Sequence, residues 1–217
     1  MQSQTRGGTR WRRFAVVMVP SMAATAAIGV AVAQGALAAS FSVSGQQFKV
    51  RAGELVGEDF VQYGALDKNS AGPHPVAVVG LKSATISNLC QSVVIPIPML
   101  HKDVTMKLTA GGGKDKVTAD TLYIDADVLK ADAKFEDIDI GVPVDNTKRG
   151  ENGGKGPGPA PGDLYEKGSF AQQAKRVTFT DAKQRAWATT AGTFNLKGLH
   201  MDVGFGKNEC FTDAELE

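Results

Sequence analysis

The sequence predicts an all-β domain, and three observations lead to that prediction. Apolar and polar residues alternate at every second place along several segments, which is the pattern of strands with one buried face and one wet face. No stretch after Ala39 sustains a helical apolar stripe, although residues 170–175 fit a turn or two of helix. Short segments of similar spacing also recur. We expect an open curled sheet, a partial β-solenoid or an antiparallel meander, with one disulfide.

The predicted strands are spread over the chain after residue 39. In chain order they are 41–44, 48–50, 104–110, 122–128, 177–179 and 199–205. If these strands share one curled sheet, the apolar residues on their inner face line either a groove or a plain core. That inward-facing set is Val104, Met106, Leu108, Ile124, Val128, Leu199, Met201 and Val203.

A faint internal similarity runs through these strands. Residues 84–89 and 133–138 share the spacing A-x-Φ-x-x-Φ, where Φ is apolar, and residues 194–199 match its second half. Short strands with regular kinks stack as a partial solenoid or form a curled sheet. A simple antiparallel meander explains the three matches as well, so the topology stays open.

The first 38 residues predict export from the cell. Four arginines precede a largely apolar, uncharged run from Phe14 to Ala33, and a small-residue cleavage site follows at 36–38. This order is that of a secretory signal peptide, so we expect a signal over residues 1–38 and a secreted, extracellular mature domain over 39–217. The alternatives are a retained membrane anchor and, because Arg12 and Arg13 are adjacent, twin-arginine export.

Charge and cysteine usage narrow the class of protein. The signal segment holds four arginines and no acids, which leaves the mature part with 20 basic and 23 acidic residues and a net charge of −3. This is not the concentrated basic surface of a nucleic-acid-binding protein, so no nucleic acid partner is expected. Cys90 and Cys210 both lie in the exported part, where an oxidising compartment favours one disulfide between them over a free nucleophilic thiol.

A glycine- and proline-rich segment interrupts the strands at 145–168. Its composition cannot propagate a helix or a central strand, so it predicts a long surface loop. We expect a solvated connector between two parts of one sheet, and the alternative is a lid over a site.

The candidate catalytic residues are His200, Asp202, Ser92 and His101. His200 and Asp202 are two apart on a predicted strand and therefore share a face, so they could pair as a base and its orienting carboxylate. Ser92 lies two residues after Cys90, beside backbone that the expected disulfide would fix, and His101 follows a long apolar run. The alternative is the plain polar face of an edge strand. No serine lies in G-x-S-x-G, which disfavours an ordinary lipase fold.

Metal ligands and cofactors are not indicated. No two histidines have the spacing of zinc ligands, and His74 lies in a proline-flanked segment that predicts a solvated turn. The acids around Asp125 and Asp127 fail the calcium-loop pattern, because Leu129 occupies the third ligand place. Strand alternation explains these acids as a solvated face, so we expect no metal and no cofactor.

Seven short phrases carry a resemblance to a known family. They are Gly57–Tyr63, Leu89–Ser92, Ala110–Gly113, Ile138–Gly141, Gly168–Ala174, Ala191–Phe194 and Glu209–Phe211. With these phrases the chain resembles a family of small secreted proteins of filamentous soil bacteria that are labelled cholesterol esterase. The resemblance implies hydrolysis of fatty-acid esters of sterols, with a lipid or sterol ester as substrate and transient contact with a membrane or lipid surface. It brings no assigned nucleophile.

Three hypotheses about function therefore stand. The first is a secreted steryl ester hydrolase that releases sterol and fatty acid from long-chain cholesteryl esters on a fold unlike that of lipases. The second is a secreted lipid-binding β-protein without catalysis, which a curled sheet with an apolar interior would suit. The third is a structural protein of the cell surface.

Overall fold

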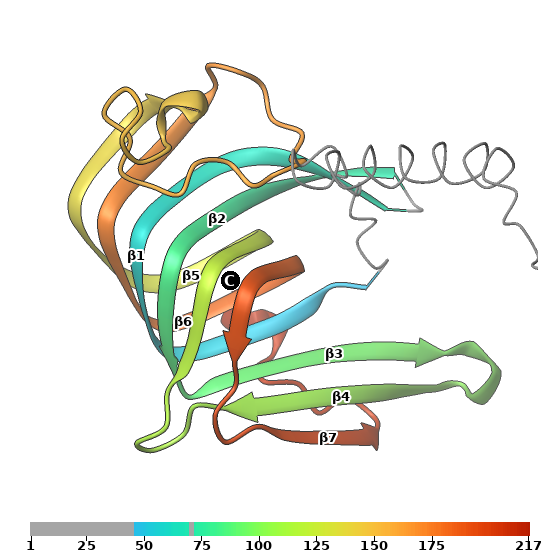
Figure 1. Ribbon diagram of the computed structural model, residues 1–217. Coiled ribbons are helices and arrows are strands. Elements are labelled where there is room, and N and C mark those ends of the chain that lie inside the picture. Colours follow the sequence, from blue (N-terminus) through green and yellow to red (C-terminus); the bar gives the residue numbers. More distant parts are fainter. Residues whose placement is uncertain (1–45, 70–71) are drawn as a thin grey trace, which may run out of the picture. The chain divides into compact units, whose positions relative to one another are not determined.

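The computed structural model of the protein describes residues 46–69 and 72–217 (Figure 1). The expected signal peptide over 1–38 and the predicted strand at 41–44 lie outside these residues. Seven strands form one sheet, with three short 3₁₀ turns between or after them. The strands are β1 (Phe48–Asn69), β2 (Gly72–Ser87), β3 (Leu89–Ile97), β4 (Lys102–Ala110), β5 (Val117–Pro143), β6 (Phe170–Asn195) and β7 (His200–Phe205). The 3₁₀ turns are η1 (Pro98–Leu100), η2 (Val144–Asn146) and η3 (Asp213–Glu215).

Every strand pairing is antiparallel, so the all-β prediction is confirmed and the solenoid alternative is not observed. The strand order is β2-β5-β6-β1-β3-β4-β7, and β1 also pairs with β2. The four longest strands, β1, β2, β5 and β6, therefore close into a ring. The remaining strands, β3, β4 and β7, extend from β1 as a three-stranded sheet, which we call the wing (Figure 1).

The ring strands are long and bend sharply, and the bends have a common local cause. A straight strand of the length of β5, which has 27 residues, would span about 90 Å. Non-glycine residues with left-handed backbone angles interrupt the pairing within these strands, at Asp59, Thr121, Asp137 and Asp181, and another, Asn88, separates β2 from β3. Asn88 and Asp137 occupy the same place in the two A-x-Φ-x-x-Φ segments, and Gly198, with φ of 67°, occupies it in the third. The internal similarity thus marks a recurring bend.

The main core lies inside the ring. Phe60, Leu81, Leu122 and Val177 are fully or almost fully buried there, one from each ring strand. The phenyl group of Phe60 packs against those of Phe135 and Phe179, with centroid distances of 5.2 and 6.2 Å. Removing such side chains from water is the main source of stability in a sheet this curved.

The other face of β1, β2 and β5 is also buried, beneath the glycine- and proline-rich segment. Val61, Tyr63 and Tyr123 pack there with Val144 of η2 and with the partly buried Tyr165 of the segment. These strands are covered on both faces, which explains why Leu122, Tyr123 and Ile124 are buried in succession.

The same segment differs in part from the solvated connector expected from its composition. Residues 150–153 are exposed, but Gly156 and Gly158 are buried against the sheet. A Cβ on Gly156 would lie 2.8 Å from the carbonyl oxygen of Phe60, so only glycine allows this close approach. Arg149 forms a two-pronged ion pair with the buried Asp59 and fixes the exposed part of the segment to β1.

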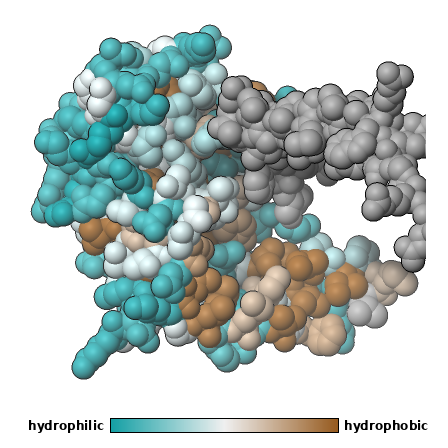
Figure 2. Space-filling view, viewed as in Figure 1, coloured by the Kyte–Doolittle hydropathy of each residue, from teal (hydrophilic) through white to brown (hydrophobic). Residues whose placement is uncertain are grey.

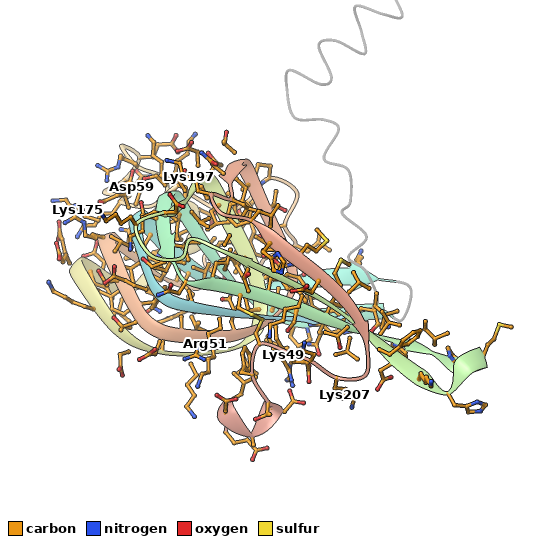
Figure 3. The ribbon with its side chains drawn as sticks, turned by 90° about the horizontal axis from the view of Figure 1, so that it is seen from below. Lys49, Arg51, Asp59, Lys175, Lys197 and Lys207 are labelled. Carbon is orange, nitrogen blue, oxygen red and sulfur yellow. A yellow bond between two sulfur atoms is a disulfide. The ribbon has the colours of Figure 1, made fainter. Side chains whose placement is uncertain are left out.

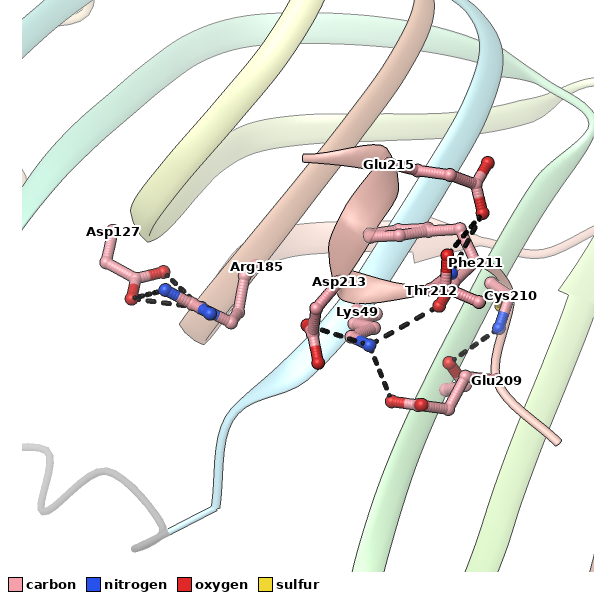
Figure 4. Close-up of polar contacts among 10 residues, drawn as sticks. Lys49, Asp127, Arg185, Glu209, Cys210, Phe211, Thr212, Asp213 and Glu215 are labelled. Atoms are coloured by element: carbon pink, nitrogen blue, oxygen red, sulfur yellow. Dashed lines mark hydrogen bonds and ion pairs between the residues drawn. The ribbon is translucent and has the colours of Figure 1, made fainter. Parts of the chain in front are cut away.

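The predicted disulfide between Cys90 and Cys210 is confirmed, with the two Cα atoms 5.8 Å apart. It joins β3 to residues 206–217, which we call the tail. Lys49 on β1 holds the tail as well, because its ammonium pairs with Glu209 and Asp213 at 2.9 Å each (Figure 4). The pKa of Lys49 is raised: its burial acts in the opposite direction, and the hydrogen bonds to the two carboxylates outweigh it.

Residues 170–175 begin β6 and do not form the helical turn that the sequence allowed. Within residues 46–69 and 72–217, no helix is long and apolar enough to cross a membrane.

Candidate functional site

A largely apolar cavity of about 40 Å³ lies inside the ring and opens to solvent. Twelve of its fifteen lining residues are apolar, and the other three are Gln91, Gln184 and Thr189. The apolar residues are Val50, Ala52, Leu55, Val79, Ile86, Leu89, Leu122, Ile124, Leu129, Phe179, Ala182 and Phe194. An apolar lining with a few polar groups is typical of sites for small apolar ligands, and a ligand here would also occupy the open mouth of the cavity.

Two glutamine amides form the main polar feature of the cavity wall. Gln91 on β3 and Gln184 on β6 are both paired with Val50 on β1, so the three side chains lie in one row across the wall. Neither amide has a hydrogen-bond partner among the described residues. A ligand with one hydroxyl or carbonyl group could satisfy them, because an amide both donates and accepts.

The cavity wall continues onto one face of the wing. The row that contains Val50 and Gln91 runs on through Leu108 of β4 to Met201 of β7. Val93, Ile95, Val104, Met106, Val203 and Phe205 share that face in neighbouring rows. Figure 2 shows hydrophobic side chains gathered over the wing. Cavity and wing face therefore form one continuous apolar surface.

This arrangement corrects the predicted groove lining. Of the eight residues expected to face inward, Ile124 alone lines the cavity. Val104, Met106, Leu108, Met201 and Val203 lie on the wing, because β4 and β7 pair outside the ring. Leu199 lies in the turn before β7 and is half exposed, and Val128 is partly buried without lining the cavity.

His200 and Asp202 are brought together as their spacing indicates. The imidazole Nε2 lies 2.9 Å from the carboxylate of Asp202, and their side chains are 70% and 63% exposed. Both belong to the polar face of β7, opposite the face that carries Met201 and Val203. The pair is thus on the reverse side of the wing from the surface that leads to the cavity.

Ser92 and His101 do not join this pair. Ser92 is on the same polar face, separated from Asp202 by the intervening strand β4, and it is buried beneath the tail. Its hydroxyl oxygen accepts a hydrogen bond from the backbone N–H of Cys210 at 3.0 Å. His101 ends the 3₁₀ turn at the tip of the β3–β4 hairpin. The four candidate residues therefore do not form one catalytic cluster.

A polar cluster that the sequence did not indicate lies under the glycine- and proline-rich segment. Asp67 of β1 is paired with His74 of β2, Asp125 comes from β5, and Asp163 comes from the segment. The hydroxyl of Tyr63 donates to Asp163 and accepts from the backbone N–H of Ala160. The imidazole of His74 is stacked on Trp187, with ring centroids 4.3 Å apart, so His74 is not in the solvated turn expected for it.

Burial dominates the electrostatics of this cluster. Burial, followed by repulsion from Asp67 and Asp163, raises the pKa of Asp125 to about 7. The pKa values of Asp67 and Asp163 are raised as well, mainly by burial. One oxygen each of Asp67 and Asp125, and Nε2 of His74, are buried without a hydrogen-bond partner among the described residues. The β1–β2 hairpin, β5 and the glycine- and proline-rich segment supply the four groups, so no single local spacing could have indicated the cluster.

Other acids on β5 form the solvated face that alternation predicts, and several are paired with bases. Asp127 accepts hydrogen bonds from Arg185 on β6, and Asp137 lies 2.6 Å from both Lys155 and Lys175. These pairs lower the pKa of Asp137 to about 2. In the part of the chain that the structure describes, no group of three or more His, Cys, Asp or Glu side chains could hold a metal ion.

Comparison with known proteins assigns the chain to a family but indicates no activity. No curated protein and no solved structure matches it. One family model, described as a family of unknown function (DUF6230), matches residues 44–211. This range contains all seven strands, the cavity lining and both cysteines. Because the match covers most of the 217 residues, the chain belongs to the DUF6230 family.

Proposed function

We propose that this protein binds a lipid in the cavity inside the ring and does not alter it chemically. The observation that supports this proposal best is the cavity itself, in which twelve of fifteen lining residues are apolar. Each methylene that a ligand buries there contributes about 0.8 kcal/mol. A fatty acyl chain or a sterol supplies many such groups.

The two free amides indicate the polar part of the ligand. Gln91 and Gln184 flank Val50 on the wall, so a single hydroxyl, carbonyl or carboxyl group could reach both. The remaining polar lining group is the hydroxyl of Thr189. We therefore expect a ligand with a long or polycyclic apolar body and one small polar head, such as a sterol or a fatty acid.

The lining also argues for binding without catalysis. It contains no serine, cysteine, histidine or acid, so the cavity wall offers neither the usual nucleophiles nor a base for ester hydrolysis. A lipid held by this wall meets amides and apolar groups alone, apart from Thr189.

The proposal is tested by extracting the purified protein with organic solvent and by titrating it with a fluorescent sterol and a fluorescent fatty acid. We expect one of these classes to copurify and to bind. Gln184→Leu should weaken binding of a ligand with a hydroxyl or carboxyl head about tenfold, the value of one good hydrogen bond. Gln172→Leu, also on β6 but outside the lining, is the matched control. Folded protein that neither carries nor binds either lipid would contradict the proposal.

Steryl ester hydrolysis, the activity that the resemblance implies, is a second candidate. The observation in its favour is the pair His200–Asp202, which has the geometry of a base and its orienting carboxylate. In that case the purified protein releases cholesterol from cholesteryl oleate, and His200→Ala reduces the rate at least about a hundredfold. Lys107→Ala, whose residue neighbours Asp202 on the same face, is the control for local disturbance. An unchanged rate in His200→Ala would remove the pair from any active site.

A further inference from the structure

Exposed apolar side chains are concentrated on the wing. Among residues 46–69 and 72–217, twelve large apolar residues are exposed, and seven of them lie on the wing, at its hairpin tip or immediately before β7. They are Ile95, Met99, Met106, Leu199, Met201, Val203 and Phe205. Water-exposed apolar groups in such numbers on one small sheet mark an interaction surface.

The charge of the wing differs from that of the mature domain. Residues 89–110 and 197–207 contain four lysines and two aspartates, whereas residues 39–217 carry a net charge of −3. One of the two aspartates, Asp202, is paired with His200. Figure 3 shows Lys207 and Lys49 near the base of the wing, and Lys197 with Asp59 and Lys175 toward the opposite end. The wing is thus the basic part of an acidic domain.

Basic and apolar groups are adjacent at the outer end of the wing. The ammonium of Lys102 lies 5.5 Å from the ring centroid of Phe205, and Phe205 is 71% exposed. The hairpin tip between β3 and β4 is the 3₁₀ turn η1 (Pro98–Leu100). Its middle residue, Met99, is 92% exposed. Apolar side chains beside lysines are suited to the boundary of acyl chains and anionic headgroups in a bilayer.

We propose that the wing docks this protein on the surface of an anionic lipid bilayer. Charge favours this occupant, because Lys102 lies beside the exposed Phe205 on the apolar face, and a lysine there is complementary to anionic headgroups. Continuity favours it too, since the row Val50, Gln91, Leu108 and Met201 leads from the docking surface into the cavity. In this respect the inference rests on the proposed function: the docked wing provides the path by which a lipid passes between bilayer and cavity.

The test measures binding of the purified protein to vesicles of phosphatidylcholine with and without phosphatidylglycerol. We expect binding to the anionic vesicles that weakens as salt is added. The double variant Met99→Glu, Phe205→Glu should bind at least about tenfold more weakly, and Lys102→Glu alone roughly fivefold more weakly. Ile140→Glu and Phe170→Glu, which replace residues 66% and 63% exposed on β5 and β6, are the matched controls and should bind like the wild type.

Three results would overturn the proposal. They are failure of the wild type to bind anionic vesicles, unchanged binding by the double variant, and equal loss in the matched controls. Analytical ultracentrifugation tests whether a second copy of this chain covers the wing instead of a bilayer. That alternative holds if the wild type forms a dimer and does not bind vesicles, and if the double variant is a monomer. Titration with a soluble fluorescent fatty acid separates the two proposals. The double variant should still bind that ligand, whereas Gln184→Leu should dock normally and bind it less well.

Discussion

The ring and the wing are built from the same kind of alternating sequence, yet they bury their apolar faces to very different extents. In the ring, β1 and β2 have one face in the core and the other under the glycine- and proline-rich segment. In the wing, the tail covers the polar face at Ser92 and Thr105. On the other face, Met201, Val203 and Phe205 remain exposed. Alternation thus determines which side chains share a face, and the connections between strands determine what covers that face.

The two regions are also joined by few contacts. β1 pairs with β3 over three residue pairs, Lys49–Ser92 to Arg51–Cys90, whereas it pairs with β2 over fifteen. The disulfide and the ion pairs of Lys49 supply much of the remaining attachment through the tail. We therefore expect the ring to dominate the stability of the domain and the wing to depend on the tail.

The first prediction compares one phenylalanine from each region. Phe60→Ala should lower the free energy of unfolding by about 3–5 kcal/mol, because it leaves a cavity among Phe135 and Phe179 in a fully buried site. Phe205→Ala should change it by less than about 0.5 kcal/mol, because that ring is mostly in water. Urea unfolding of both variants measures the difference. Similar losses in the two would show that the wing is part of the cooperative core.

The sequence predicted the all-β class and the disulfide because both depend on local or compositional rules. The strands follow from the two-residue periodicity of apolar residues. The disulfide follows because a chain with two cysteines allows a single intramolecular pairing. The cavity could not be predicted in the same way. Leu108 and Ile124 have equivalent patterns, but β4 pairs with β3 and β7 outside the ring, and β5 closes the ring between β2 and β6. Strand order is a long-range property that periodicity does not contain.

The second prediction loosens the wing. Replacing Cys90 and Cys210 by serine should lower stability by about 2–4 kcal/mol, since the bridge spans 120 residues and constrains the unfolded chain. Hydrogen exchange should increase most in β3, β4 and β7, because the tail then depends on Lys49 and a few hydrogen bonds for its attachment. Hydrogen exchange followed by mass spectrometry, with Lys49 left intact, locates the change. Uniform loosening of ring and wing would contradict the division into two regions.

The third prediction concerns the polar cluster of the ring. The folded state raises the pKa of Asp125 to about 7, so between about pH 4 and pH 7 the folded protein holds a proton that the unfolded chain has lost. Stability should therefore fall as the pH rises through this window, by up to about 4 kcal/mol, because each pKa unit corresponds to about 1.4 kcal/mol. The raised pKa values of Asp67 and Asp163 act in the same direction, and the coulombic influence of His74 opposes the rise at Asp67.

Asp125→Asn should flatten this dependence, and thermal unfolding followed by circular dichroism at pH 5 and pH 8 measures it. Asp120→Asn, an exposed carboxylate on the same strand, is the control for removing one negative charge. Groups with lowered pKa values, such as Asp137 and Glu215, both at about 2, lose their contribution at more acidic pH and do not affect this window. Equal slopes in wild type and Asp125→Asn would mean that other groups govern the pH dependence.

The last prediction tests the recurring bend that curves the ring strands. Thr121 on β5 has φ of 52°, a left-handed conformation that is especially unfavourable for a β-branched residue. Thr121→Gly should therefore raise the free energy of unfolding by up to about 1 kcal/mol, because the relief of strain exceeds the entropy that glycine loses. Thr118→Gly, at an exposed position in the regular part of β5, should lower it by about 1 kcal/mol. The sign of the difference between the two variants, measured by urea unfolding, is decisive. If both lower stability equally, the bend is imposed by packing in the ring, and the residue at the bend has no local role.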